Sequence, residues 1–176
     1  MYELVTLRDK IRVEPQNISK DKKNAIKQQI KQEYIGKIID NRMLIVGFID
    51  IIKINEGIII PNDPAVFYDT IFNVLAYLPM LHEPVRGQVT EISEIGAMVN
   101  IGPIDGLVHI SQVMDDFVDF SKNALVGRKS KTSVKVGDTV IANISVISTK
   151  GMMKIGLTMR SPGLGKLGKK KEKSKA

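Results

Sequence analysis

Apolar positions in the first part of the chain predict a helix packed on a sheet. Tyr2–Glu14 alternates and is rich in β-forming side chains, which indicates a strand that ends at Pro15. Apolar side chains then recur every fourth residue, and the preceding Ser19 has the hydroxyl of a suitable N-cap. This pattern predicts an amphipathic helix over about Lys20–Ile39.

Three more strands are expected before the middle of the chain. Met43–Ile54 is β-branched and almost continuously apolar, as in a strand buried on both faces. Asn55-Glu56-Gly57 has the composition of a tight turn, and Ile58–Ile60 then forms a short strand. Ala65–Leu78 alternates over its whole length. Residues 1–82 are therefore predicted to form an α+β domain of order β-α-β-β-β, with one helix on an antiparallel sheet.

The second part of the chain has a pattern of five short strands. They are predicted at Val85–Ile92, Ala97–Ile101, Gly106–Ile110, Thr139–Ser148 and Met153–Met159. A long stretch, Ser111–Gly137, is interpreted as an irregular insertion after the third strand. Five short strands with such an insertion are typical of an all-β OB-fold barrel, here expected over residues 83–165.

The positive charge of the chain is concentrated at one end. The formal net charge is +7. Residues 1–82 and 83–165 each contribute +1, whereas residues 166–176 contribute +5. This tail has no apolar period on which to fold, and two interpretations stay equally open. It is either a solubilising disordered end or a flexible arm that attracts phosphates.

Composition also narrows the classes of function. The chain has no cysteine, which excludes disulfides, thiolate nucleophiles and zinc–thiolate sites. No signal peptide and no apolar run of about 18 residues is present, so we expect a cytoplasmic protein that does not enter a membrane. His82 and His109 lie in different settings and no nucleophile–base motif is visible, so neither catalysis nor a cofactor is expected. The carboxylates Asp115, Asp116 and Asp119 are interpreted as solvated rather than as a metal site.

Glycine and apolar spacings in the predicted barrel resemble those of the S1 RNA-binding domain. The motifs that carry the resemblance are Gly87-x-Val89, Gly96–Ile101, Gly106–Ser111, Val136–Val140 and Ile155–Thr158. They involve all five predicted strands, and together they are specific although no single one is.

Strand alternation separates the barrel core from its outer face. If Ala97 and Val99 point inward, Met98 points outward, and His109 is expected beside it. The resemblance implies that the outward set Ile95, Met98, His109 and Lys154 faces RNA. S1 domains usually carry aromatic residues where this chain has Ile95 and Met98, so weak and sequence-tolerant binding is expected. Met98 has an alternative interpretation as a surface residue covered by a partner protein.

A cluster of basic residues in the insertion is a second candidate for contact with RNA. Arg128, Lys129 and Lys131 follow Gly127 directly, with Lys135 close behind. A basic loop beside an OB-fold face can hold the nucleic-acid backbone.

Longer strings resemble one family over nearly the whole chain, the E-prime stalk subunit of archaeal RNA polymerase. These strings are Asn73–Pro79, Gly102–Leu107, His109–Asp116 and Leu157–Arg160. The resemblance implies a truncated RNP-like N-terminal domain that docks on the polymerase core, a heterodimer with the F-type stalk subunit, and nascent single-stranded RNA at the S1 face. It also implies that the catalytic site lies in other subunits.

The candidate core-docking tip is the segment Asn55–Pro64. Within it Asn55, Glu56, Gly57 and Pro61 are selected, because a glycine and prolines favour a rigid projecting turn. The alternative function is a free-standing S1 RNA-binding factor of the translation or exosome-cap type.

Overall fold

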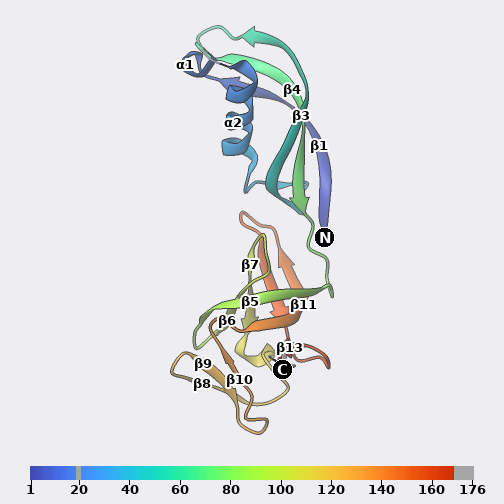
Figure 1. The fold of residues 1–176 in the computed structure, drawn as a ribbon, viewed down its shortest axis with the longest axis vertical. Coiled ribbons are helices and arrows are strands. Elements are labelled where there is room, and N and C mark those ends of the chain that lie inside the picture. The colour runs from blue at the N-terminus through green and yellow to red at the C-terminus, as the bar shows by residue number, and fades with distance from the viewer. Residues whose placement is uncertain (19–20, 169–176) are drawn as a thin grey trace, which may run out of the picture. The chain divides into compact units, whose positions relative to one another are not determined.

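A computed structural model describes residues 1–18 and 21–168 of the chain (Figure 1). The chain divides into two compact units, Met1–Leu78 and the residues from Pro79 onward. The division follows Leu78, whereas the expected boundary lay after His82.

The first unit is an antiparallel sheet with one main helix. Its elements are β1 (Tyr2–Val13), α1 (Pro15–Ile18), α2 (Lys22–Tyr34), β2 (Ile38–Ile39), β3 (Met43–Ile59) and β4 (Val66–Tyr77). The strand order is β1-β4-β3-β2, and every neighbouring pair is antiparallel. Figure 1 shows α2 on one side of this sheet. The predicted α+β class is confirmed.

The helix is shorter than predicted at both ends. Asp21 is its N-cap, and a carboxylate oxygen accepts from the backbone N–H groups of Lys23 and Asn24 at 3.1 and 3.4 Å. The predicted cap, Ser19, lies outside the described residues. At the other end Ile35 is already extended, and Ile38–Ile39 form β2 beside β3 instead of a last helical turn. The apolar period continues past Tyr34 because Ile39 packs against the same core from a strand.

One face of the sheet and α2 enclose the core of this unit. Ile26 and Ile30 of α2 are fully buried, as are Ile11, Phe72 and Val74 of the strands. The ring of Tyr34 meets Phe72 edge-on at a centroid distance of 5.1 Å, and its hydroxyl donates to Asp9. Burial, followed by this hydrogen bond, raises the pKa of Tyr34. The isoleucine stripe of α2 is therefore core and is not available to a partner protein.

The expected turn at Asn55-Glu56-Gly57 is wrong, because these residues continue β3. Ile54 pairs with Thr70 and Gly57 pairs with Tyr68, so a bulge absorbs one extra residue of β3. A Cβ atom at Gly57 would lie 2.6 Å from Val66 Cγ1 and 2.8 Å from Tyr68 Cε1. The glycine thus permits close approach within a strand and does not mark a chain reversal.

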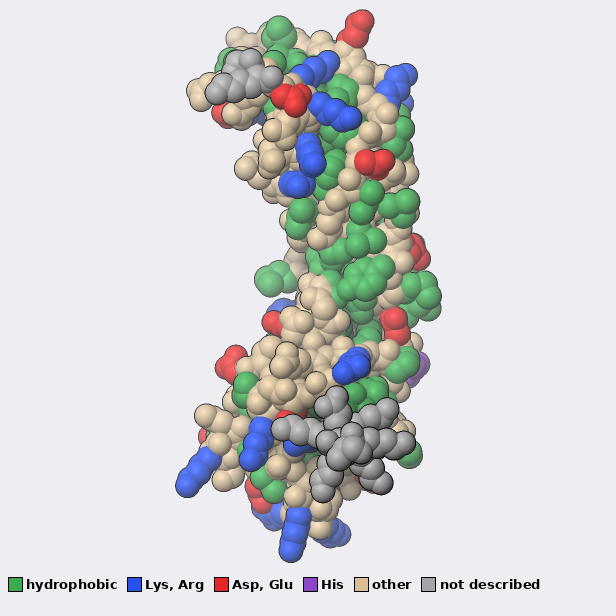
Figure 2. All heavy atoms as spheres, viewed as in Figure 1, with side chains coloured by type: hydrophobic (Ala, Val, Ile, Leu, Met, Phe, Trp, Pro, Cys, Tyr) green, Lys and Arg blue, Asp and Glu red, His purple; other side chains and the backbone are tan. Residues whose placement is uncertain are grey.

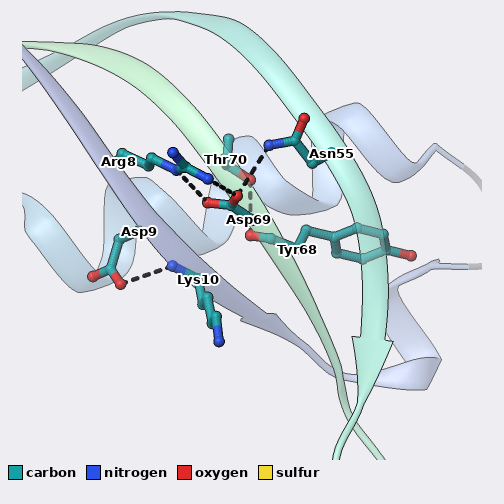
Figure 3. Close-up of polar contacts among 7 residues, drawn as sticks. All are labelled: Arg8, Asp9, Lys10, Asn55, Tyr68, Asp69 and Thr70. Carbon is teal, nitrogen blue, oxygen red and sulfur yellow. Dashed lines mark hydrogen bonds and ion pairs between the residues drawn. The ribbon is translucent and has the colours of Figure 1, made fainter.

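A polar network crosses three strands on the sheet face that α2 does not cover (Figure 3). Arg8 of β1 donates to both carboxylate oxygens of Asp69, with Nε–Oδ1 at 3.1 Å and Nη2–Oδ2 at 2.7 Å. Asn55 Nδ2 of β3 donates to Asp69 Oδ2 at 3.0 Å. The hydrogen bond from Arg8, and then that from Asn55, lowers the pKa of Asp69 to about 2.

This network predicts a specific acid sensitivity. A carboxylate whose pKa is lowered by folding stabilises the protein above its unfolded pKa of about 3.9, and this contribution is lost as pH falls through the folded pKa. The free energy of unfolding should therefore fall between about pH 4 and pH 2 more steeply in wild type than in Asp69→Asn. Arg8→Gln removes the main cause of the lowered pKa of Asp69. This variant should therefore lose the same pH-dependent part of the free energy of unfolding. Urea unfolding at several pH values measures this, and equal slopes in wild type and Asp69→Asn would contradict it.

The second unit is a five-stranded barrel with a small additional sheet. The barrel strands are β5 (Pro84–Ile92), β6 (Gly96–Asn100), β7 (Asp105–His109), β11 (Thr139–Ser148) and β12 (Lys154–Thr158). The strand order is β12-β7-β6-β5-β11, and the barrel closes because β12 also pairs with β11. The short strand β13 (Gly165–Lys166) pairs antiparallel with the first part of β11. Each predicted barrel strand is found within one or two residues of its expected ends, and the OB-fold class is confirmed.

The insertion was expected to be irregular, and this expectation is wrong. It forms a three-stranded antiparallel sheet. Its strands are β8 (Val118–Ser121), β9 (Ala124–Gly127) and β10 (Ser133–Lys135), in the order β10-β9-β8, after a short 3₁₀ turn at Ile110–Gln112. Lys122 and Asn123 both have positive φ and make a two-residue hairpin turn between β8 and β9. Strands of three or four residues are too short to show a convincing alternation.

Among the described residues, no helix is long and apolar enough to span a membrane.

Candidate nucleic-acid interface

The outer face of the barrel has a groove of about 910 Å³. We call it the barrel groove and define it by residues from β6, β7, β11, β12 and the β11–β12 turn. Its principal lining residues are Met98, Leu107, His109, Val146, Met152 and Lys154. The lining is mainly apolar, with one histidine and one lysine among the groups that can donate hydrogen bonds.

Strand register explains why these side chains meet. Met98 pairs with Leu107 and Gly96 pairs with His109, so these residues share the outer face of β6 and β7. The residues that alternate with them along the strands, including Val99 and Val108, are fully buried in the barrel core. The alternation predicted from the sequence is therefore confirmed for Met98 and His109.

The side chain of His109 is oriented by its neighbour Ser111. The Ser111 N–H donates to His109 Nδ1 at 3.2 Å, and Ser111 Oγ lies 2.8 Å from the same nitrogen. Because Nδ1 accepts, the neutral ring carries its proton on Nε2. His109 can therefore offer an N–H donor from a fixed ring.

The structure brings together three of the four residues predicted on this face. Met98, His109 and Lys154 all line the barrel groove. Ile95 is exposed but does not line it. Sequence reasoning missed Leu107 and Met152. Leu107 alternates with the buried Val108 and could have been found from that pattern, whereas Met152 lies in a turn that no periodicity marks.

The predicted basic cluster does not line the barrel groove and lies at the β9–β10 turn. Figure 2 shows Lys and Arg side chains gathered over the β8–β10 sheet. Arg128 makes a two-pronged ion pair with Asp119, Nε–Oδ2 at 2.7 Å and Nη2–Oδ1 at 2.8 Å, which lowers the pKa of Asp119. Lys129 and Lys131 make no ion pair within the described part of the chain. Of the three residues, Arg128 is thus the least available to an RNA phosphate.

The remaining carboxylates of the insertion are also engaged. Asp115 pairs with Arg160 at 2.7 Å. Asp116 accepts from the backbone N–H groups of Lys129 and Ser130 at 2.7 and 2.9 Å, and these bonds lower its pKa, that from Ser130 most. Within residues 1–18 and 21–168, no group of three or more metal-ligating side chains is close enough to hold an ion.

Comparison with known proteins shows two matching domains and one family. The model of the S1 RNA binding domain matches residues 78–153, and that of the SHS2 domain found in N terminus of Rpb7p/Rpc25p/MJ0397 matches residues 8–64. The DNA-directed RNA polymerase subunit Rpo7 of Sulfolobus acidocaldarius is 36% identical over 171 residues, which cover 95% of this chain and 93% of that protein. The chain belongs to the Rpo7 family.

Other relatives agree with this assignment. Rpo7 of Saccharolobus solfataricus is 36% identical over 172 residues, covering 95% of the chain and 96% of that protein. DNA-directed RNA polymerase III subunit rpc8 of Schizosaccharomyces pombe is 31% identical over 107 residues, covering 61% of the chain and 53% of that protein. As a member of the Rpo7 family, the chain is an RNA polymerase stalk subunit with an S1 RNA-binding domain, and the resemblance to the archaeal stalk protein is confirmed.

Proposed function

We propose that this protein docks on the polymerase core, pairs with the F-type stalk subunit, and holds nascent single-stranded RNA in its barrel groove. The catalytic site of the enzyme then lies in other subunits. The observation that carries the proposal is the convergence of Met98, His109 and Lys154 in one groove of the S1 barrel. The free-standing alternative has no such support, because the match to polymerase subunits covers 95% of the chain.

The chemistry of the groove suits RNA that is held loosely and without sequence preference. Bases can lie against the polarisable Met98 and Met152 and the aliphatic Leu107, while Lys154 attracts phosphates. No barrel strand carries a Phe, Tyr or Trp ring, and stacking on such rings is worth about 1–3 kcal/mol per base. Affinity is therefore modest, and a high local RNA concentration at the polymerase compensates for it.

Charge removal tests the RNA site. Lys154→Gln should weaken binding to all single-stranded RNA sequences to a similar extent and should lower the slope of log affinity against log salt by about one. Lys129→Gln should have the same kind of effect, whereas Arg128→Gln should have a smaller one because Arg128 already pairs with Asp119. Lys23→Gln on the exposed side of α2 is the matched control. Fluorescence anisotropy at several salt concentrations measures the slopes, and an unchanged slope in Lys154→Gln would remove Lys154 from the site.

We narrow the candidate docking tip to the turn between β3 and β4. Of the four residues selected, Asn55 belongs to the polar network, Glu56 and Gly57 lie in β3, and Pro61 alone lies in the turn. Beside Pro61 the last residues of the hairpin expose their side chains. These are Ile58, Ile59 and Ile60. Exposed large apolar side chains gathered at the end of a hairpin are a candidate interaction surface.

The turn is fixed in place by ion pairing. Arg12 of β1 donates to both oxygens of Asp63 at 3.1 Å, and Asp63 Oδ1 accepts from the Ala65 N–H at 3.0 Å. The hydrogen bond from Arg12 is the main cause of the lowered pKa of Asp63. A rigid apolar tip loses little conformational entropy when it docks. We therefore propose that this hairpin tip contacts the polymerase core.

A substitution at the tip tests this contact. Ile59 is 70% exposed, so Ile59→Ser should leave folding almost unchanged. The affinity of the Ile59→Ser variant for a polymerase core that lacks this protein should fall about tenfold or more, as expected when an apolar anchor is removed. Ile49→Ser, also exposed on β3, is the matched control. Equal core binding by Ile59→Ser and wild type would contradict the docking role.

The pairing with the F-type stalk partner has its own test. Tyr2 and Leu4 of β1 are large apolar residues that remain more than half exposed in this chain alone, as expected for a surface that a partner covers. Co-expression with that partner should increase the yield of soluble protein and raise its melting temperature. If the lone chain is monomeric and equally stable, an obligate partner is excluded.

A further inference from the structure

We propose that Phe117, Lys129 and Arg160 form a second RNA subsite, in which a base stacks on the Phe117 ring beside the barrel groove. The inference rests on the proposed RNA function of the barrel and extends it to a surface of the insertion that was not among the residues selected for stacking. We call this surface the Phe117 platform. It lies in a separate hollow of about 430 Å³.

The composition of the hollow suits a nucleotide. Its principal lining residues are Ser111, Asp115, Asp116, Phe117, Lys129 and Arg160. It thus combines an aromatic ring for a base with Lys129 for a phosphate, and with Arg160, which already pairs with Asp115. Its volume lies within the range of about 300–1,000 Å³ that is typical of ligand clefts.

Phe117 combines an exposed ring with a fixed backbone. The side chain is 72% exposed, the same as Met152 and more than any other large apolar side chain among the described residues. Its N–H donates to Asp116 Oδ1 at 2.7 Å, and its carbonyl accepts from the Arg128 N–H at 2.8 Å. Because the backbone is already fixed, stacking on a base would cost only the rotamer freedom of the Phe117 side chain.

The charges around the ring leave one cation, Lys129, for an anion, because the two nearby carboxylates are already engaged. Asp116 is occupied by three backbone N–H groups, those of Phe117, Lys129 and Ser130. Asp115 is occupied by Arg160. Lys129 has no ion pair within the described residues, so its ammonium group is available to a phosphate.

The platform adjoins the barrel groove through one hydrogen-bonded pair. His109 lines the groove, Ser111 lines the hollow, and His109 Nδ1 lies 2.8 Å from Ser111 Oγ. A strand of RNA can therefore pass from Met98 across His109 to Phe117 without leaving the surface of the second unit.

The Phe117 platform supplies a phenyl ring for base stacking, which the barrel strands lack. Phe117 and Phe120 are the only Phe, Tyr or Trp residues after Tyr77, and Phe120 is the less exposed of the two. Exposed aromatic rings also occur at protein interfaces, but the ammonium group of Lys129 and the continuity with the groove favour RNA here.

Binding of a fluorescent oligouridylate of about 12 nucleotides to the full chain tests the inference. Phe117→Ala and Phe117→Leu should each weaken binding about fivefold or more, whereas Phe117→Tyr should retain it, because the ring and not its apolar area makes the contact. Phe120→Ala is the matched control. If Phe117→Leu binds as tightly as wild type, stacking on the platform is excluded.

A direct signal comes from a tryptophan at the same position. The chain has no tryptophan, so Phe117→Trp carries a single emitter whose fluorescence should fall when a base stacks on it. Phe120→Trp should show little change. RNA binding that leaves the Phe117→Trp emission unaltered overturns the platform.

The two proposals fail in different ways. If wild type and every variant bind no RNA, the proposed function itself fails. A second outcome is that wild type binds RNA and that Lys154→Gln weakens this binding while Phe117→Ala does not. RNA binding in the barrel groove is then supported, and RNA binding at the Phe117 platform is overturned. If Phe117→Ala keeps its RNA affinity but loses polymerase, the platform is a protein contact and the inference is again overturned.

Discussion

Gly96→Ala should destabilise the barrel by at least about 2 kcal/mol. Gly96 has a φ of +154°, and a Cβ atom there would lie 2.0 Å from the backbone oxygen of Val108. The side chain cannot move away from backbone, so β6 and β7 must separate. These two strands carry Met98 and His109, and we therefore expect the variant to lose RNA binding as well. Urea unfolding followed by circular dichroism measures the change.

The control is Gly47→Ala in β3. A Cβ at Gly47 would meet only the Cβ of Leu75, at an ordinary 3.9 Å, so a change within about 0.5 kcal/mol is expected. If Gly96→Ala were as stable as Gly47→Ala, the close pairing of β6 with β7 would be wrong.

Phe72→Ala should destabilise the first unit by about 3–5 kcal/mol. Phe72 is fully buried between α2 and the sheet and meets the ring of Tyr34, so the substitution leaves a cavity that rigid strands cannot fill. Because the unit also bears the proposed docking tip, loss of polymerase association should accompany loss of stability. Thermal unfolding measures the effect.

Phe67→Ala on the same strand is the matched comparison. Phe67 belongs to the opposite face of β4 and is only half-buried, so a smaller loss is expected. Equal losses at the two positions would contradict the assignment of the core to the α2 side of the sheet.

The barrel could be predicted from the sequence because its alternation is regular. Val99 and Val108 are buried and Met98 and His109 face outward, as the period of two requires. The first unit was harder, because local composition near Gly57 resembles that of a turn. Only the packing of Val66 and Tyr68 against that glycine reveals a bulge in a continuous strand.

The chemistry of the insertion could not be predicted, for a different reason. Its charged residues form a cluster in the sequence, but which of them pair depends on the β8–β9 hairpin. This hairpin places Arg128 against Asp119 and directs Asp116 to backbone N–H groups. The exposure of Phe117 depends on the same geometry, and no apolar period predicts it.

The roles of Met98, His109 and Lys154 in RNA binding stay predictions, and one measurement tests them most directly. A polymerase assembled with this protein would transcribe RNA that carries a photoreactive uridine just outside the enzyme, and crosslinked residues would be mapped by mass spectrometry. The account predicts crosslinks on β6, β7 and β12 that decrease in Lys154→Gln. Crosslinks that map only to other subunits, while this chain remains bound to the polymerase, would contradict it.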